Sequence, residues 1–283
     1  MTTEAVAETA PAKINLCLHV TGRRLDGYHL LDSLVVFADV ADRVFATPAH
    51  GLSLVVAGPE GAGLHAETDN LVLRAARAMG IADAALVLDK RLPIASGIGG
   101  GSADAAATLR ALHRLTGQPL PPMSDVLRLG ADVPVCLDGC PSRMTGIGER
   151  VTHLPPLPRM ACVLVNPRLP VPTPQVFAAL TSRENPPLPE LPHSALGSVR
   201  SFAHWLAATT RNDLIAPARE VAPILADVQT ALEATPDCLL ARMTGSGGTH
   251  FGLYATTEAA ETAAAVLRAA HPFWWIEAGR VQN

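Results

Sequence analysis

The chain has 283 residues, of which 26 are acidic and 22 basic, so its formal net charge is −4. A chain without excess basic charge is not expected to bind nucleic acid, and 48% hydrophobic against 17% charged residues excludes a disordered chain. The sequence shows neither a membrane-spanning apolar run nor a secretory signal, and its five scattered cysteines suit a reducing compartment. We therefore expect a cytoplasmic globular protein without a membrane partner, and nothing in the sequence indicates a protein partner.

The first half of the chain predicts strands followed by helices. Residues 12–20 alternate between apolar and polar side chains, which predicts a strand with one buried face and with Lys13, Asn15 and His19 on the other face. Further strands are expected at 30–40, 52–57 and 85–92, and helices at 70–79, from Ser102 to about 115, and at 125–129, where Gly130 follows.

The second half begins after a cluster of prolines at 155, 156 and 158, which indicates a linker between two domains, 1–154 and 159–283. Strands before helices in the first half, and alternating elements in the second, favour an α+β fold over a doubly wound sheet. The pattern predicts a strand at 161–166, helices at 198–209 and 217–234, and a strand, a helix and a strand at 239–255, 257–270 and 274–281.

A glycine-rich segment between a predicted strand and a predicted helix is the most informative part of the sequence. Consecutive glycines let backbone N–H groups approach an anion, and the following helix adds free N–H groups and the positive end of its dipole. The segment therefore predicts a phosphate-binding loop. It lacks both the Gly-Lys-Ser/Thr of a Walker A motif and the G-x-G-x-x-G of dinucleotide-binding loops. It reads Pro93-Ile94-Ala95-Ser96-Gly97-Ile98-Gly99-Gly100-Gly101-Ser102-Ala103.

Phosphoryl transfer would also need a carboxylate near the acceptor hydroxyl and a cation that favours the developing negative charge. Lys13 is one of only two lysines, and Asp132 lies in Gly-Ala-Asp-Val-Pro at 130–134, at a predicted helix end. Taken alone, such an aspartate is as often a turn former, and a lysine on a strand is usually only solvated. The prediction of a catalytic pair therefore depends on the sequence around both residues.

The glycine-rich segment resembles the signature Pro-x-x-x-Gly-Leu-Gly-Gly-Gly-Ser-Ser of the GHMP kinase superfamily, with Ile98 for the leucine and Ala103 for the last serine. Residues 243–249 resemble the third motif of the superfamily. Three further strings together resemble the members that phosphorylate a cytidine-diphosphate-linked methylerythritol in the non-mevalonate (MEP) isoprenoid pathway. They are Pro-Ala-Lys-Ile-Asn-Leu at 11–16, Asp-Gly-Tyr-His at 26–29 and Gly-Ala-Asp-Val-Pro at 130–134.

The resemblance implies a two-domain GHMP kinase fold, with an N-terminal domain like domain 2 of ribosomal protein S5 and a ferredoxin-like C-terminal domain. It also implies ATP-dependent phosphorylation of the substrate's 2-hydroxyl, with Mg²⁺ held mainly by phosphates and water and by Ser102 as a weak ligand. The implied site consists of the catalytic Lys13 and Asp132 (the general base), the ATP loop 93–103, Asn70 and Lys90 at the adenine, the cytidine-recognition pair Tyr28 and His29, and the further substrate contacts Asn15, Thr173 and Phe177.

Two other functions are compatible with parts of this pattern. A related kinase acting on homoserine or a mevalonate-like alcohol is disfavoured by Asp-Gly-Tyr-His, because a small acceptor needs no base-stacking residue. A catalytically silent nucleotide-binding sensor is disfavoured because both Lys13 and Asp132 are present. The sequence departs from the family pattern at 137–142, at 145–149, and at Gly248 and His250 in and after the third motif.

Overall fold

The computed structural model describes residues 5–62, 64 and 70–282, and the chain forms two compact units. The first unit comprises residues 1–13, 41–94 and 99–139, and the second comprises 14–40, 95–98 and 140–283. Strands β1 (Val6–Arg23) and β2 (His29–Thr47) are long enough to contribute residues to both units. The domain boundary predicted at 155–158 stays a prediction.

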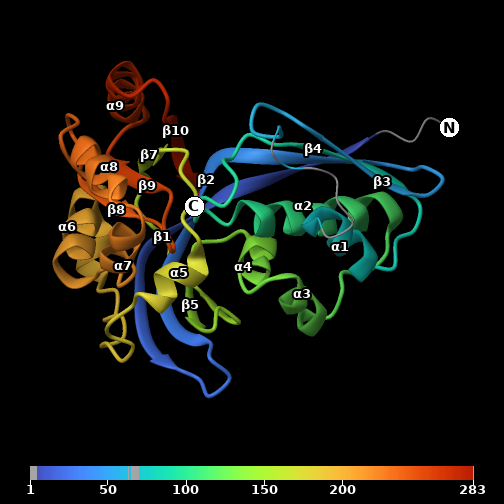
Figure 1. Ribbon diagram of the computed structural model, residues 1–283, viewed down its shortest axis with the longest axis horizontal. Coiled ribbons are helices and arrows are strands. Elements are labelled where there is room, and N and C mark those ends of the chain that lie inside the picture. The colour runs from blue at the N-terminus through green and yellow to red at the C-terminus, as the bar shows by residue number, and fades with distance from the viewer. Residues whose placement is uncertain (1–4, 63, 65–69, 283) are drawn as a thin grey trace. The chain divides into compact units, whose positions relative to one another are not determined.

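The first unit combines a small mixed sheet with four helices. Strand β3 (Leu52–Ala57) pairs in parallel with β4 (Ala84–Asp89), and β4 pairs antiparallel with the end of β2. The helix α1 (Leu71–Ala78) connects the parallel strands, as a parallel pair requires. The other helices are α2 (Gly100–Thr116), α3 (Met123–Leu129) and α4 (Val133–Asp138), and Figure 1 shows α1 and α2 on one side of β3 and β4.

The small residues of α2 explain how it packs at the centre of this unit. Ala103, Ala105, Ala106 and Ala107 are buried, and their short side chains let α1 and α4 approach closely. The N-terminus of α2 is thereby fixed on its neighbours.

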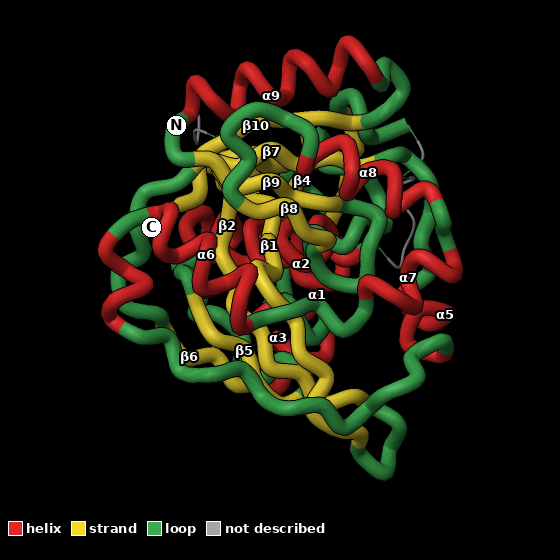
Figure 2. Tube along the Cα trace, turned by 90° about the vertical axis from the view of Figure 1, so that its left-hand side faces the viewer, coloured by secondary structure: helices red, strands yellow, loops and turns green. Residues whose placement is uncertain are grey.

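The second unit contains a sheet with two covering helices. Its elements follow the order β7 (Ala161–Asn166), α8 (Ile224–Glu233), β8 (Leu240–Met243), β9 (His250–Tyr254), α9 (Thr257–Ala270) and β10 (Trp275–Gln282). The strands lie side by side in the order β10-β7-β9-β8, and each neighbouring pair is antiparallel; Figure 2 shows them one after another in this order. This βαββαβ arrangement is ferredoxin-like, so the predicted fold class is confirmed.

The second unit also contains a cluster of buried apolar residues, which includes Leu18 and Val20 of β1, Leu214, and Met243 of β8. Strand β2 pairs with β5 (Ser142–Gly146), which pairs with β6 (Arg150–His153), and Phe37 and Ala38 of β2 meet the end of β10. The other elements are α5 (Thr173–Ala178), the 3₁₀ helix η1 (His193–Gly197), α6 (Val199–Thr209) and α7 (Ile215–Val221).

Among the described residues, no helix combines the length and the apolar character that crossing a membrane would require.

The prediction of a single buried face for the first strand was wrong. Lys13, Asn15 and His19 are 4%, 3% and 0% exposed, so both faces of β1 are covered. The polar side chains on this face of β1 bond to other protein groups. An alternating sequence pattern cannot tell a face covered by polar protein groups from a face exposed to solvent.

Two predicted elements are each divided in the structure. The helix predicted at 217–234 is α7 and α8, separated at Pro223, because a residue before proline is disfavoured in the helical conformation, and Ala222 has φ −140°. The strand predicted at 239–255 is β8 and β9, separated by the glycine-rich turn at 244–249. The short α4, directly after Asp132, is not among the helices predicted from the sequence. Asp132 therefore lies between two helices, α3 and α4.

Candidate active site

The N-terminus of α2 forms the end of the predicted phosphate loop. The helix begins at Gly100, two residues before the predicted start, because Gly99 adopts a left-handed conformation with φ +64° that turns the chain into the helix. The first intrahelical bond runs from the Ala103 N–H to the Gly99 carbonyl oxygen at 2.8 Å. The N–H groups of the first turn, at Gly100, Gly101 and Ser102, therefore have no acceptor within the helix and suit an anion.

Lys13 and Asp132 are brought together within the first unit. The Lys13 Nζ lies 2.7 Å from Oδ2 of Asp132, although the residues are far apart in the sequence. Asp132 occupies the position before α4, but its side chain does not cap that helix. The carboxylate is therefore directed to the lysine, and at 35% exposure it is accessible to a bound molecule, whereas the Lys13 side chain is 5% exposed.

Lys13 also packs directly on the loop. A Cβ atom at Gly99 would lie 3.3 Å from Cβ and from Cε of Lys13, closer than most real contacts of this kind. Glycine at position 99 is thus required both by its positive φ and by the approach of the lysine stem. The ammonium group, the carboxylate and the start of α2 consequently belong to one arrangement within this unit.

The two residues predicted at the adenine have other contacts in the structure. Asn70 precedes α1, and its Oδ1 accepts the Val72 N–H at 2.9 Å, as an N-cap does. The Lys90 ammonium is 3% exposed and bonds to Oδ2 of Asp42 and, at 2.9 Å, to Oδ2 of Asp104. Their contact with adenine stays a prediction.

Asp42 and Asp104 are not among the site residues predicted from the sequence. Burial is the main cause that raises the pKa of Asp104, to about 7; Asp42 adds to this and Lys90 opposes it. Burial also disfavours the charge of Lys90, but the two carboxylates outweigh this and raise its pKa. A signal was present for Asp104, since it is the only acidic residue in the Ala-rich helix α2, whereas nothing in the sequence singled out Asp42.

Asn15 lies in the second unit, and one of its side-chain polar atoms makes no hydrogen bond. Its backbone N–H donates to Oγ1 of Thr244 at 2.8 Å, and its Nδ2 donates to Oγ of Ser33 at 2.7 Å. Its Oδ1 is buried and has no hydrogen-bond partner among the described residues. An unused acceptor of this kind is suited to a hydroxyl group of a bound molecule.

The third motif forms a turn that packs against residues 95–98. A Cβ atom at Gly97 would lie 2.4 Å from the Gly247 carbonyl oxygen, and the Thr249 N–H donates to the Ser96 oxygen at 3.0 Å. Gly248, a departure from the family pattern, has φ +89° and lies against Ser96, so the backbone conformation accounts for a glycine there.

His250, which follows this turn, is fully buried. Neither ring nitrogen has a partner among the described residues, and burial, with a smaller effect of Arg219, lowers its pKa to about 3. It is therefore neutral at physiological pH.

The predicted cytidine residues also lie in the second unit. The rings of His29 and Phe177 stack with centroids 4.7 Å apart, whereas Tyr28 is 60% exposed and offers its ring to solvent. Nε2 of His29 is buried without a partner in the described part of the chain, and burial followed by Arg23 and Arg183 lowers the pKa of His29.

Thr173, the last of the predicted substrate residues, bonds through Oγ1 to Oγ of Ser246 in the third motif at 2.6 Å. No contact of the Ser246 hydroxyl was predicted from the sequence, although Ser246 belongs to the third motif.

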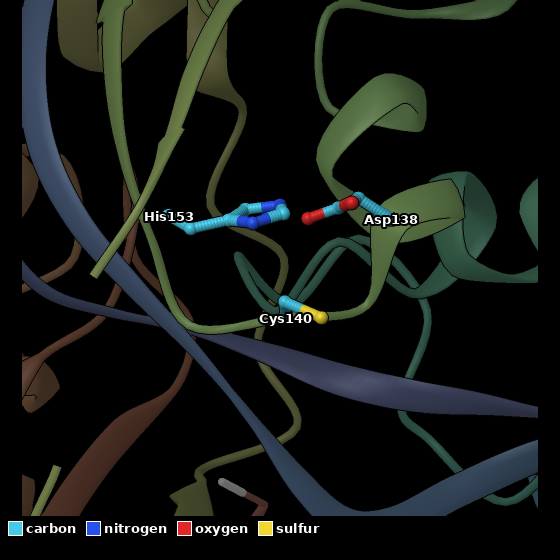
Figure 3. Close-up of side chains that lie close together, drawn as sticks. All are labelled: Asp138, Cys140 and His153. Carbon is cyan, nitrogen blue, oxygen red and sulfur yellow. The ribbon is translucent and has the colours of Figure 1, made fainter. Parts of the chain in front are cut away.

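Figure 3 shows Cys140 and His153, whose sulfur and ring nitrogen lie within 4.8 Å of each other, together with Asp138, the last residue of α4. Antiparallel pairing of Ser142 with His153 explains why the cysteine and histidine are neighbours. All three side chains are exposed, and exposed groups of this kind are common without an ion, so we assign no metal to them.

A glycine-rich loop that opens a helix N-terminus beside a lysine–aspartate pair defines a small-molecule kinase without a Walker A lysine. Comparison with known families agrees. The model of the GHMP kinases N terminal domain matches residues 70–146, and that of the GHMP kinases C terminal domain matches residues 188–272. The chain therefore belongs to the GHMP kinases.

Individual relatives match along almost their full length. The chain is 60% identical to a 4-diphosphocytidyl-2-C-methyl-D-erythritol kinase of Cereibacter sphaeroides (strain ATCC 17025), with 99% of each chain covered. It is 56% identical to the kinase of the same name from Ruegeria pomeroyi, with 98% of this chain and 99% of the relative covered.

Solved structures show the same relationship. A crystal structure of 4-(cytidine 5'-diphospho)-2C-methyl-D-erythritol kinase is 35% identical, with a TM-score of 0.81 over 98% of this chain and 99% of the other. Homoserine kinase from Cytophaga hutchinsonii, at 17% identity and a TM-score of 0.63 over 99% of this chain and 96% of the other, shares the fold alone.

Proposed function

We propose that this chain is an ATP-dependent kinase that phosphorylates the 2-hydroxyl of 4-diphosphocytidyl-2-C-methyl-D-erythritol in the non-mevalonate pathway to isoprenoid precursors. The observation that carries the proposal is the full-length identity of 60% to a kinase of that name, combined with the Lys13–Asp132 pair beside the loop. Tyr28, His29 and Phe177 supply aromatic groups for a pyrimidine, which a kinase of small alcohols would not need.

The chemistry follows from the properties of these groups. Asp132 accepts the proton of the 2-hydroxyl while that oxygen bonds to the γ-phosphorus, and the bond from this phosphorus to the oxygen bridging to the β-phosphate breaks, releasing ADP. The Lys13 ammonium, 2.7 Å from Asp132, offsets the negative charge that develops on the attacking oxygen. The N–H groups of the first turn of α2 hold phosphate oxygens.

Mg²⁺ would be held mainly by phosphate oxygens and water. The ion prefers oxygen ligands, and in the first unit the carboxylates of Asp132, Asp42 and Asp104 are each bonded to a lysine. The hydroxyl of Ser102, in the first turn of α2, is the remaining candidate ligand, so the residues fit an ion that arrives with ATP. We further propose a cytoplasmic location, as expected for an enzyme of this pathway.

Incubation of the protein with ATP, Mg²⁺ and a panel of alcohols tests the proposal. The panel contains the cytidine-linked methylerythritol, homoserine and mevalonate, and ADP release is followed with phosphorus NMR of the product. We expect turnover with the cytidine-linked compound alone. Turnover with homoserine or mevalonate, or ADP release without any phosphorylated alcohol, would contradict it.

A further inference from the structure

Lys90 lies at the centre of a buried cluster in the first unit that consists of Lys90, Asp42 and Asp104. All three side chains are at most 3% exposed, and the ammonium group bonds to one oxygen of each carboxylate. A buried charge is tolerated only when it is paired and hydrogen-bonded, so each member requires the others. The pairing fixes the positions of three separate elements.

The Asp42 arm of this cluster holds the chain where it enters the glycine-rich segment. Oδ1 of Asp42 accepts the backbone N–H groups of Arg91 and Leu92, the latter at 2.8 Å, while Oδ2 binds Lys90. The backbone of Lys90 is itself fixed, since its N–H donates to the Ala57 oxygen at 2.8 Å and its oxygen accepts the Glu60 N–H at 3.0 Å. Hydrogen bonds to the backbone of residues 90–92 and to the side chain of Lys90 therefore hold this segment in place.

The Asp104 arm holds the helix that receives the phosphate. Asp104 is in the second turn of α2, and the Lys90 Nζ bound to it would lie 3.1 Å from a Cβ atom placed at Gly100, the first residue of the helix. The ammonium is thus packed against the start of α2. A shift of the cluster would move the N–H groups that Gly100 and its neighbours present.

We propose that Lys90 is a positioning residue, which through Asp42 and Asp104 holds the first turn of α2 in the geometry that binds the phosphates of ATP. This role does not require contact between Lys90 and adenine. The inference rests on the proposed ATP-dependent function. Because the cluster fixes the N-terminus of α2, we expect Lys90 to affect the binding of the phosphate groups of ATP and not the binding of its adenosine part.

The two carboxylates differ in a way that makes the inference testable with isosteric substitutions. Both carboxylate oxygens of Asp42 accept hydrogen bonds, one from backbone N–H groups and one from Lys90. An asparagine has only one side-chain oxygen, so Asp42→Asn must lose either the bonds from the backbone or the bond from Lys90. Asp104 uses only Oδ2, because its Oδ1 has no partner in the described part of the chain. Asp104→Asn can therefore keep its oxygen on Lys90 and place its amide nitrogen at the unused position.

The experiment measures the affinities of ATP, inorganic tripolyphosphate and adenosine by calorimetry, at a temperature at which every variant is folded by circular dichroism. Asp42→Asn and Asp104→Ala are expected to weaken ATP and tripolyphosphate by roughly tenfold and to leave adenosine unchanged, since small displacements of binding groups cost affinity. Asp104→Asn is expected to stay within about threefold of the original protein. Asp125→Asn, which alters an exposed pair with Arg128, is the control and should change nothing.

Several outcomes would overturn the inference. Unchanged tripolyphosphate affinity with a lowered melting temperature in Asp42→Asn would show that the cluster serves stability alone. Weaker adenosine binding in the same variant would place its effect at the base. If Asp104→Ala does not fold, Asp42→Asn decides the question by itself. If the original protein binds neither ATP nor tripolyphosphate, the proposed function is refuted as well. If the original protein binds both and Asp42→Asn binds them with the same affinities, only the positioning role is refuted.

Discussion

The predicted catalytic pair and the predicted substrate residues differ in how their polar atoms are used. Lys13 and Asp132 bind each other, so their geometry is set before any molecule arrives. Oδ1 of Asn15 and Nε2 of His29 are buried and without partners among the residues that the structure describes. Buried polar atoms without partners are costly, so a ligand that supplies partners gains affinity. The predicted catalytic pair is thus already paired in the structure, and under the proposed function the predicted recognition residues would gain their missing partners from the substrate.

Asp132→Asn tests the preorganised pair and should have the largest effect. The amide keeps the size of the side chain but cannot accept the proton, so we expect kcat to fall by about 10²-fold or more while ATP affinity changes little. Steady-state kinetics and calorimetry measure the two quantities, with Asp125→Asn as the matched control. Near-normal turnover would remove Asp132 from the mechanism.

Tyr28→Ala tests the recognition region. Loss of a stacked base should cost roughly 1–3 kcal/mol of binding of the cytidine-linked substrate, and ATP affinity should be unchanged. Tyr28→Phe, which retains the ring, should bind both almost normally. Equal weakening of both ligands in Tyr28→Ala would argue against a stacking role.

The pH dependence of stability tests the buried cluster of Lys90, Asp42 and Asp104. Burial raises the pKa of Asp104 from 3.8 to about 7, so the folded protein holds a proton there that the unfolded chain has lost. This contribution to stability is present at low pH and is lost as pH rises through this interval. In Asp104→Asn it is absent, so the variant should gain melting temperature relative to the original protein on going from pH 5 to pH 8. A constant difference between the two proteins across this range would contradict the assigned protonation.

His250→Leu should have the smallest effect and tests whether every buried nitrogen without a partner awaits a ligand. We expect the free energy of unfolding to rise by about 1 kcal/mol because two unpaired nitrogens are removed, and the KM values of both substrates to stay the same. Thermal unfolding at pH 7 measures the first effect, and the exposed His204→Leu serves as control. A raised KM would instead assign His250 to the binding site.

The sequence by itself determined the place of the glycine-rich loop before α2 and most elements of the fold, because local conformation and side-chain periodicity are encoded within short segments. Strand β7 and helix α9 followed from such patterns, whereas the ferredoxin-like arrangement of the second half was implied by the resemblance to the family. A proline at 223 was sufficient to divide a helix that periodicity alone had joined.

Only the tertiary structure decided which charges meet. The Lys13–Asp132 pair joins residues that no local pattern connects, and resemblance to a family had to suggest it before the coordinates placed the atoms 2.7 Å apart. That Lys90 is buried between Asp42 and Asp104 follows only from the folded structure, because no local pattern connects these three residues. Burial and pairing of charge arise from the packing of distant segments, and the free energy of each buried charge depends on partners that only the folded chain supplies.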